Sequence, residues 1–350
     1  MEKIFLAPYN KPAKALAEIL HKKHGLNVMF IDSHKHDNLT IFHPENLTNL
    51  KIDKIVIVST NFYEEIYQIL LKNKMIKNKI YFYDSIYKLY FTSSFFYKYF
   101  LLFQRILNKF TLFISSLKLK KYKNKHLNQR CFILGNGPSL TINDLNKLTN
   151  EITFASNKIY LGFDATIWRP NYYFVEDHLV LQQNYETIKH LHGFQKFFPN
   201  ISLKWAPKVR SGIYYNLIYD FEKTHFSDDP IKGFYWGATV TYSMIQMAAY
   251  MGFKEIYLLG IDFNFIGSSH KIAIGDTGVF VSTGEQNHFH KDYRAQGEQW
   301  TVPDTAFQEK AFKTAQKYAS TKNISIFNSS RKTQLTIFSL KVFDDLFPSS

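Results

Sequence analysis

The chain has 350 residues, of which 45% are hydrophobic, 17% aromatic and 21% charged, with one cysteine and a net charge of +14. This length predicts about two domains of roughly 100 to 200 residues each, and the apolar content excludes a chain too polar to fold. Cys131 alone can form neither an internal disulfide nor a cysteine-based zinc site, so we expect a cytoplasmic protein. The start resembles no signal peptide, and no uncharged apolar run reaches about 18 residues, so we expect no transmembrane helix.

Residues 1–85 predict a small α/β domain, because short apolar runs alternate with segments of helical spacing. We expect strands near residues 3–6, 27–32, 54–58 and 80–83, and helices over 12–23 and 63–72. The first turn, residues 7–10, lacks the glycines of a dinucleotide-binding fingerprint. We therefore expect this domain to have a structural or partner-docking role.

The next segment carries most of the positive charge. Residues 85–143 contain ten Lys or Arg and no Asp or Glu, whereas the rest of the chain has 33 basic and 29 acidic residues. Apolar residues at three- and four-residue spacing over 96–117 predict a long helix, with Lys98, Arg105 and Lys109 on the opposite face. Such a helix, followed by lysines over 118–125, suits an anionic membrane surface. The alternative is an interdomain helix packed on either core.

The basic residues of this segment do not alternate with exposed aromatic residues beside a sheet, so we expect no nucleic-acid partner. We interpret residues 86–128 as a basic amphipathic linker between two Rossmann-like units with mainly parallel sheets. The second unit, residues 129–350, is the predicted catalytic domain. We expect its strands near residues 131–134, 152–157, 172–175, 255–259 and 324–327, and its helices up to 148, over 179–191, 238–251 and 304–322, and at the end of the chain.

The turn after the first strand of the second unit is the strongest local signal. Gly135 and Gly137 let the backbone approach a ligand closely, and Asn136 adds a side-chain amide. A helix starting at this turn would direct free amides, including that of Ser139, toward a phosphate. A tight structural turn explains the same glycines equally well.

Two other places carry polar side chains suited to chemistry. Asp262 and Asn264 follow the strand over 255–259, and ligands of open α/β sheets bind at such carboxyl ends. His288 and His290 lie in a glycine-rich segment typical of mobile active-site loops, where either one could act as a general base. A zinc site would need a further ligand, such as His270, and no known spacing matches.

Four stretches together, residues 132–140, residues 156–157, residues 252–263 and the loop with His288 and His290, resemble two related families. One is the MptE-like domain, which includes archaeal hydroxymethyl-dihydropterin pyrophosphokinases and many proteins of bacterial glycan clusters, and is related to the Maf flagellin glycosyltransferases. The other is glycosyltransferase family 42, the CMP-sialic-acid-dependent sialyltransferases. The resemblance covers residues 130–340.

The sialyltransferase resemblance implies that Asn136 and Asn157 hold the nucleotide and its phosphate, and that His288 or His290 is the general base. Two tyrosines support the leaving phosphate in that family, and this chain has Asn264 and His270 at the matching places. Residues 176–178 resemble the MptE-like branch instead.

We therefore predict a cytoplasmic glycosyltransferase, peripheral to the inner membrane face, that inverts the sugar of a CMP-activated donor. Its donor sugar would be sialic-acid-like or another ulosonic acid, its acceptor a surface-glycan precursor of lipopolysaccharide or capsule, and it would require no cofactor. One alternative is an ATP- and Mg²⁺-dependent pyrophosphokinase with metal ligands Asp177 and Asp262. Another is a non-catalytic protein that docks a glycan-assembly complex on the membrane; oligomers are compatible with each prediction.

Overall fold

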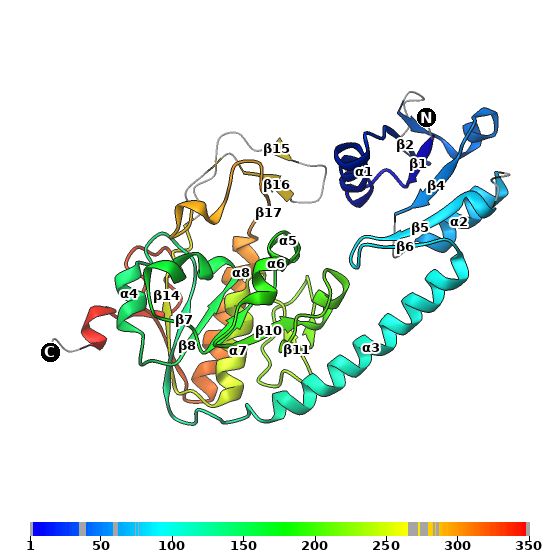
Figure 1. Cartoon of the computed structure of the whole chain (residues 1–350). Coiled ribbons are helices and arrows are strands. Elements are labelled where there is room, and N and C mark those ends of the chain that lie inside the picture. The colour runs from blue at the N-terminus through cyan, green and yellow to red at the C-terminus, as the bar shows by residue number, and fades with distance from the viewer. Residues whose placement is uncertain are drawn as a thin grey trace. The chain divides into compact units, whose positions relative to one another are not determined.

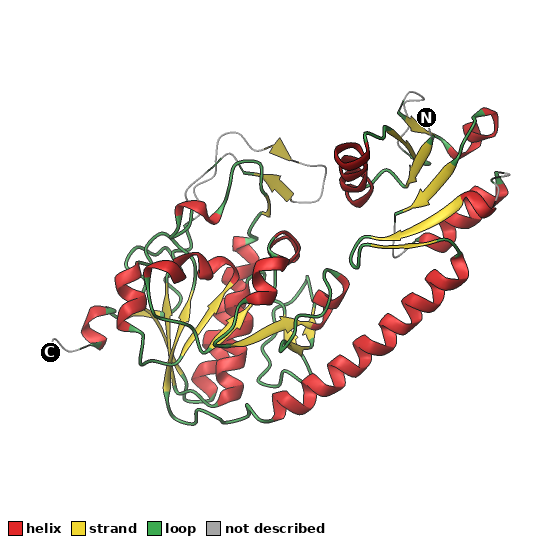
Figure 2. Ribbon diagram, in the orientation of Figure 1, coloured by secondary structure: helices red, strands yellow, loops and turns green. Residues whose placement is uncertain are grey.

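The computed structural model describes residues 3–34, 40–58, 62–73, 75, 77–264, 272–273, 279–282, 284 and 287–347. The chain divides into two compact units, Met1–Lys109 and Phe110–Ser350, and the division falls within helix α3 (Ser94–Lys120) (Figure 1). Each unit contains its own mainly parallel sheet (Figure 2), so the predicted fold class is confirmed. Among the described residues, no helix is long and apolar enough to cross a membrane.

The first unit has a six-stranded sheet in the order β3-β2-β1-β4-β5-β6, in which only β6 runs antiparallel to its neighbour. Its strands are β1 (Ile4–Ala7), β2 (Val28–Ile31), β3 (Ile41–Phe42), β4 (Lys54–Ile57), β5 (Ile80–Asp84) and β6 (Leu89–Phe91), and its helices are α1 (Lys11–His24) and α2 (Tyr63–Lys72). Alternate side chains of β1 enter different cores, Ile4 packing with α1 and Phe5 with α2. The order of the strands along the sheet reverses between β1 and β4.

Asn10 ties the first unit together at that reversal. Its side chain accepts a hydrogen bond from the Ala13 amide at 2.9 Å, which caps α1, and donates to the Val58 carbonyl at 3.0 Å. The side chain that would otherwise face a ligand therefore joins the ends of β1 and β4. This contact fits the structural role that we expect for the turn.

Helix α3 buries only a narrow side, which includes Tyr97, Thr111, Ser115 and Leu119. The predicted helix is confirmed, but most of its apolar residues are exposed instead of packed. Ten large apolar residues, which we call the apolar stripe, are at least 39% exposed: Phe95, Phe96, Tyr99, Leu102, Phe103, Ile106, Leu107, Phe110, Phe113 and Leu117.

The second unit has an eight-stranded, entirely parallel sheet in the order β11-β10-β9-β8-β7-β14-β18-β19. The strands are β7 (Arg130–Leu134), β8 (Thr153–Ser156), β9 (Tyr172–Phe174), β10 (Gln195–Pro199), β11 (Ile213–Tyr215), β14 (Glu255–Leu259), β18 (Ser325–Asn328) and β19 (Ser339–Leu340). Five further short strands form two small sheets: β12 (Leu217–Ile218), β13 (Phe234–Tyr235), β15 (Ile272–Ala273), β16 (Val279–Val281) and β17 (Gln299–Thr301).

Helices cover both faces of this sheet. One core contains residues of α7 (Val240–Met251) and α8 (Thr305–Thr321), and the other contains residues of α4 (Ile142–Lys147), α5 (His178–Gln183) and α6 (Tyr185–His190). The single helix predicted over 179–191 is therefore wrong, because the chain breaks at Asn184. The predicted terminal helix is only a 3-10 turn, Asp344–Leu346.

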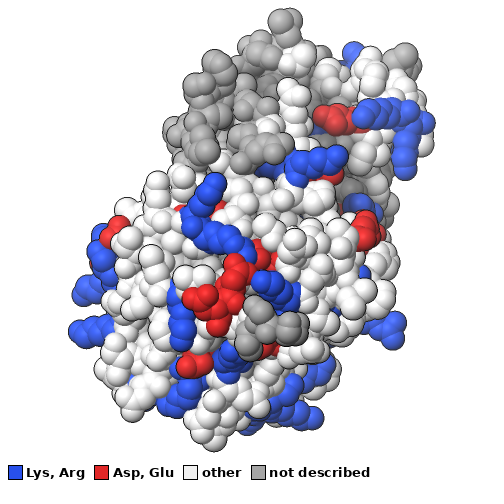
Figure 3. Space-filling view, turned by 90° about the vertical axis from the view of Figure 1, so that its left-hand side faces the viewer, with Lys and Arg blue, Asp and Glu red and all other residues white. Residues whose placement is uncertain are grey.

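Charges of both signs lie together on the face drawn in Figure 3. Acidic side chains gather at its centre, and basic side chains lie around them. On the described part of that face, the two signs of charge are therefore interspersed.

Candidate functional site

The order of the second sheet reverses between β7 and β14, so their carboxyl ends leave a crevice of the kind where open α/β sheets bind ligands. A cavity of about 160 Å³, which we call the cradle, lies at this edge. Seven of the predicted site residues line it: Gly135, Asn136, Gly137, Asn157, Asp262, Asn264 and His288. The topology thus brings together residues from four separate stretches of the sequence.

The glycine turn is held tightly against the end of β14. The Gly135 amide donates to the Leu259 carbonyl at 2.8 Å, and the Gly137 amide to the Gly260 carbonyl at 2.9 Å. A Cβ atom at Gly135 or Gly137 would lie 2.3 Å or 2.7 Å from the Gly260 oxygen. Both glycines are therefore required by the close approach of two strand ends, and their amides are already bonded within the protein.

Ser139 is also bonded within the protein, by the carboxylate of Asp262. The Ser139 amide donates to Oδ2 of Asp262 at 2.8 Å, and its hydroxyl donates to Oδ1. Helix α4 begins only at Ile142, with Thr141 as its N-cap. The predicted helix start at the glycine turn is wrong, and a carboxylate accepts the hydrogen bonds that we expected a phosphate to accept.

Asp262 is a buried acid at the floor of the cradle. Its burial raises the pKa of the carboxyl, while the two hydrogen bonds from Ser139 act in the opposite direction. This group therefore keeps its proton to higher pH than an exposed aspartate.

Two asparagine oxygens of the cradle lack hydrogen-bond partners in the described part of the chain. Asn136 donates through Nδ2 to the Ser156 carbonyl at 3.2 Å, and because a carbonyl can only accept, this bond fixes which end of the amide is oxygen. Oδ1 of Asn136 and Oδ1 of Asn157 are both buried and unbonded. A buried acceptor without a donor costs about 1 to 3 kcal/mol. The pair is therefore suited to a ligand that supplies hydroxyl or amino donors.

Asn157 owes its position to its backbone. Its φ of 54° directs the chain sharply away from β8, and the Tyr173 hydroxyl bonds its carbonyl at 2.5 Å. Asn tolerates this left-handed conformation better than most residues. The sequence singled out Asn157 through the sialyltransferase resemblance, and the structure adds this turn.

His288 lies in the cradle on a loop that is fixed at several points. The Phe289 amide donates to the Asn136 carbonyl at 2.9 Å, which joins the loop to the glycine turn. The His288 ring stacks on the buried Tyr293 ring with centroids 3.7 Å apart and an interplanar angle of 6°. The loop that we expected to be mobile is thus anchored at its middle.

Lys158 is an anchor that sequence reasoning missed. Its side chain is 8% exposed, and its ammonium group donates to the Tyr293 carbonyl at 2.9 Å and forms an ion pair with Glu298. No local pattern marked this residue, because its partners lie 135 and 140 positions later in the chain.

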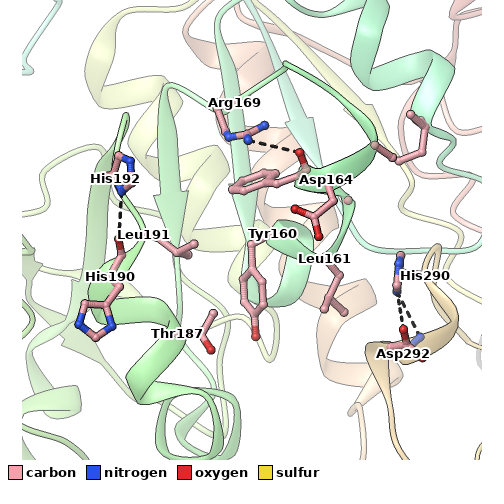
Figure 4. Close-up of a pocket in the computed structure, with 14 residues that line it drawn as sticks. Tyr160, Leu161, Asp164, Arg169, Thr187, His190, Leu191, His192, His290 and Asp292 are labelled. Atoms are coloured by element: carbon pink, nitrogen blue, oxygen red, sulfur yellow. Dashed lines mark hydrogen bonds and ion pairs between the residues drawn. The ribbon is translucent and has the colours of Figure 1, made fainter.

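His290 lies in a different cavity. Its Nδ1 accepts from the Asp292 amide at 3.2 Å, and the Asp292 carboxylate lies 3.9 Å away. Figure 4 shows these two residues facing His190 and His192 across a cavity of about 1010 Å³, which shares no lining residue with the cradle. Of the two candidate histidines, only His288 lies beside the asparagine pair; His270 lies outside the described residues.

The two predicted metal ligands of the pyrophosphokinase alternative line different cavities. Asp177 accepts hydrogen bonds from Leu179 and Val180 as the N-cap of α5, whereas Asp262 holds Ser139. Within the described residues, no group of three or more His, Cys, Asp or Glu could hold a metal ion.

Glu176, next to Asp177, has the most altered acid chemistry near the cradle. Burial raises the pKa of its carboxyl to about 7, although hydrogen bonds from Ser243 and Tyr215 oppose the shift. A carboxyl with a pKa near neutrality beside a cavity is typical of functional sites. The sequence marked residues 176–178 only as unusually acidic.

The chain is similar to one protein family and to a solved structure. No curated protein sequence matches the chain. A solved structure of the sialyltransferase CstII from Campylobacter jejuni, in complex with a substrate analogue, cytidine-5'-monophosphate, is similar at 16% identity and a TM-score of 0.37, over 62% of this chain and 86% of that one. Residues 104–268 match the family model described as 6-hydroxymethylpterin diphosphokinase MptE-like. This match begins earlier and ends earlier than the resemblance that we predict, and over these residues the chain is similar to the MptE-like family.

Proposed function

We propose that this protein is a glycosyltransferase that moves a sugar from a CMP-activated donor to a bacterial surface-glycan acceptor, with the nucleotide bound in the cradle. The observation that carries the proposal is the pair of unbonded acceptors, Oδ1 of Asn136 and Oδ1 of Asn157, at the reversal point of the sheet. A nucleoside offers matching donors in its ribose hydroxyls. Cytosine adds an exocyclic amine, which uracil lacks.

In the proposed reaction, His288 is the general base. A neutral imidazole nitrogen removes the proton of the acceptor hydroxyl, whose oxygen forms a bond to the sugar's anomeric carbon. The bond from that carbon to the phosphate oxygen breaks, and CMP leaves with the electron pair. Stacking on Tyr293 and the bond from Phe289 to Asn136 would orient the ring for this in-line, inverting step.

Asp262 would influence how tightly the cradle holds phosphate. The residues lining the cradle include no Lys or Arg among those described, so an ionised Asp262 opposes an anionic ligand. A protonated Asp262 removes this repulsion, and neutral hydrogen-bond donors such as the Asn264 amide are then sufficient for CMP as a leaving group.

The description of the matched family favours a second candidate, a diphosphokinase that uses ATP and a divalent metal. Asp177 and Asp262 would be its metal ligands. Their separate hydrogen-bonding roles and separate cavities argue against this candidate.

Equilibrium binding of CMP, UDP, GDP and ATP to the full chain separates the two candidates. If the protein is a glycosyltransferase, CMP should bind more tightly than the other three nucleotides when no metal is added. A preference for ATP in the presence of Mg²⁺ would instead support the diphosphokinase. The variant Asn136→Asp should weaken binding of the anionic CMP, because it adds a negative charge to a cradle whose described lining has no Lys or Arg, whereas Asn323→Asp, an exposed position after α8, should not.

The two histidines provide a matched pair for the catalytic step. His288→Ala should abolish turnover and keep CMP binding, while His290→Ala, in the separate cavity, should keep both. Full activity of His288→Ala would show that His288 is not the general base.

We also propose that helix α3 holds the protein on an anionic membrane surface. The apolar stripe covers about 140° of the helix circumference, and Lys98, Arg105 and Lys109 lie about 90° to 130° from its centre, so they flank the stripe on one side instead of lying directly opposite it as we expected. Lysine and arginine at such flanks reach the headgroups while apolar side chains enter the lipid boundary. A second copy of the chain would bring these like charges together, which favours lipid as the partner.

Co-sedimentation with vesicles tests this membrane role separately from catalysis. Phe103→Asp and Ile106→Asp should abolish binding to vesicles that contain phosphatidylglycerol, and they should leave turnover on a soluble acceptor unchanged. Equal vesicle binding by the variants and the parent chain would exclude α3 as the membrane-binding element. A chain that binds vesicles but has no turnover with any donor would instead support a docking protein.

A further inference from the structure

A second cavity, which we call the side pocket, adjoins the cradle. It has a volume of about 340 Å³ and shares four lining residues with the cradle: Asn157, Thr239, Val240 and Gln308. A ligand in the side pocket would therefore lie next to one in the cradle. Its remaining walls come from the start of α5, from residues 301–303 and from three aromatic residues.

The aromatic walls are Trp205, Tyr219 and Trp236, each partly exposed. Trp236 packs against Tyr219 with ring centroids 5.6 Å apart, and against Phe307 at 5.3 Å. Trp205 packs against the His178 ring at 5.7 Å. Each of these rings is thus packed against a neighbouring ring, and together they add apolar surface to the lining of the cavity.

Two neighbouring carboxylates complete the pocket, and each is fixed through one oxygen. Tyr215 at 2.8 Å and Ser243 at 2.5 Å both donate to Oε2 of Glu176. Leu179 and Val180 both donate to Oδ1 of Asp177. Among the described residues, no hydrogen bond reaches the second oxygen of either carboxylate.

The charge of this lining selects the kind of ligand. Its only titratable groups besides Tyr219 are Glu176, Asp177 and His178, and it includes no Lys or Arg of the described residues. Carboxylate oxygens accept strong hydrogen bonds from hydroxyl groups and repel phosphates and other carboxylates. Apolar ring faces beside hydroxyl acceptors match the two surfaces of a sugar, its C–H face and its hydroxyl edge.

We propose that the side pocket binds an uncharged sugar ring through Trp236, Glu176 and Asp177. That this sugar is the acceptor of the transferase rests on the proposed function, whereas the binding itself does not. The pocket therefore excludes an acceptor that ends in a sialic or uronic acid.

Two ligands that differ by one group test this charge selection. Methyl β-glucoside and methyl β-glucuronide share a ring, and only the glucuronide carries a carboxylate. Ligand-observed NMR with the full chain at pH 8, without nucleotide, should detect the glucoside and find the glucuronide at least about tenfold weaker.

Variants of the pocket complete the test. Trp236→Ala should abolish glucoside binding, while Trp300→Ala, whose ring stacks on Arg294 outside the pocket, should preserve it. Asp177→Asn keeps an N-cap for α5 and removes one negative charge, so it should reduce the difference in affinity between the glucoside and the glucuronide.

Three results would overturn the proposal: no binding of a neutral glycoside, equal binding of the glucuronide at pH 8, or unchanged binding by Trp236→Ala. Preferential binding of methyl glucosaminide would also overturn it, in favour of a cationic ligand. Because no nucleotide is present, glycoside binding can succeed while the CMP proposal fails, and the reverse.

Discussion

Replacing Glu176 by Gln should change how the stability of the second unit depends on pH. Burial raises the pKa of this carboxyl from 4.5 in the unfolded chain to about 7 in the fold. Between these two values the folded state binds more protons than the unfolded state, so stability falls as pH rises. A difference of about 2.5 units corresponds to about 3 kcal/mol of stability, which is fully present below pH 4.5 and is lost as pH rises above 7.

Glutamine keeps the shape of the side chain and can still accept from Tyr215 and Ser243, but it cannot ionise. At pH 8, Glu176→Gln should therefore be more stable than the parent chain by about 3 kcal/mol, and at pH 4 the two should be equal. Urea denaturation of both chains at pH 4, 6 and 8 measures this difference. Glu222→Gln, at an exposed position, is the control and should follow the parent chain. If Glu176→Gln and the parent lose stability in parallel with rising pH, Glu176 is not a buried acid with a raised pKa.

Three further changes test the cradle and its loop. In the parent chain, CMP binding should weaken as pH rises, because burial raises the pKa of Asp262 and only its ionised form repels phosphate. Asp262→Asn should remove this pH dependence. If titration calorimetry finds the same pH profile for the variant and the parent, Asp262 does not have this role. Lys158→Met should destabilise the fold by about 3 to 5 kcal/mol by leaving Glu298 unpaired, and adding Glu298→Leu should recover most of the loss in urea denaturation. Gly137→Ala should cost roughly 1 to 3 kcal/mol, because its Cβ would meet the Gly260 oxygen at 2.7 Å, and an unaltered denaturation midpoint would show that the turn can shift.

The central strands could be predicted from the sequence because strands buried on both faces appear as continuous apolar runs. The runs that predict β7 and β14 coincide with those strands to within one residue. Helices on the surface were harder to predict from the sequence. Asn184 ends α5, where its side chain bonds the Val180 carbonyl at 2.9 Å and competes with helix continuation, which apolar spacing alone does not reveal.

Helix α3 shows what periodicity leaves open. Spacing located the helix, but it does not say which face is buried. The predicted stripe turned mostly to solvent, and the buried side uses Thr111 and Ser115 beside Tyr97 and Leu119. Ser115 accepts a hydrogen bond from the Tyr214 amide at 3.1 Å, a contact across 99 positions that only the fold creates.

Part of the candidate site was predictable from topology. Residues that follow parallel strands meet at one edge of the sheet, so Asn136, Asn157 and Asp262 line one cavity, as expected. The hydrogen bonds among them were not predictable. Asp262 accepts from Ser139, 123 positions away, and thereby replaces the phosphate contact that the glycine turn suggested. Local patterns carry no information about such distant polar pairs.

The most direct test of the account is a calorimetric titration of the full chain with CMP and with UMP. The two nucleotides differ at position 4, where cytosine donates a hydrogen bond and uracil accepts one, and at N3, where cytosine accepts and uracil donates. If Oδ1 of Asn136 or Asn157 receives that donor, UMP leaves an acceptor unpaired, and a cost of about 1 to 3 kcal/mol predicts binding about 5- to 150-fold weaker than CMP. Equal affinities, or binding of neither nucleotide, would contradict the proposal that the asparagine pair recognises a cytidine nucleotide.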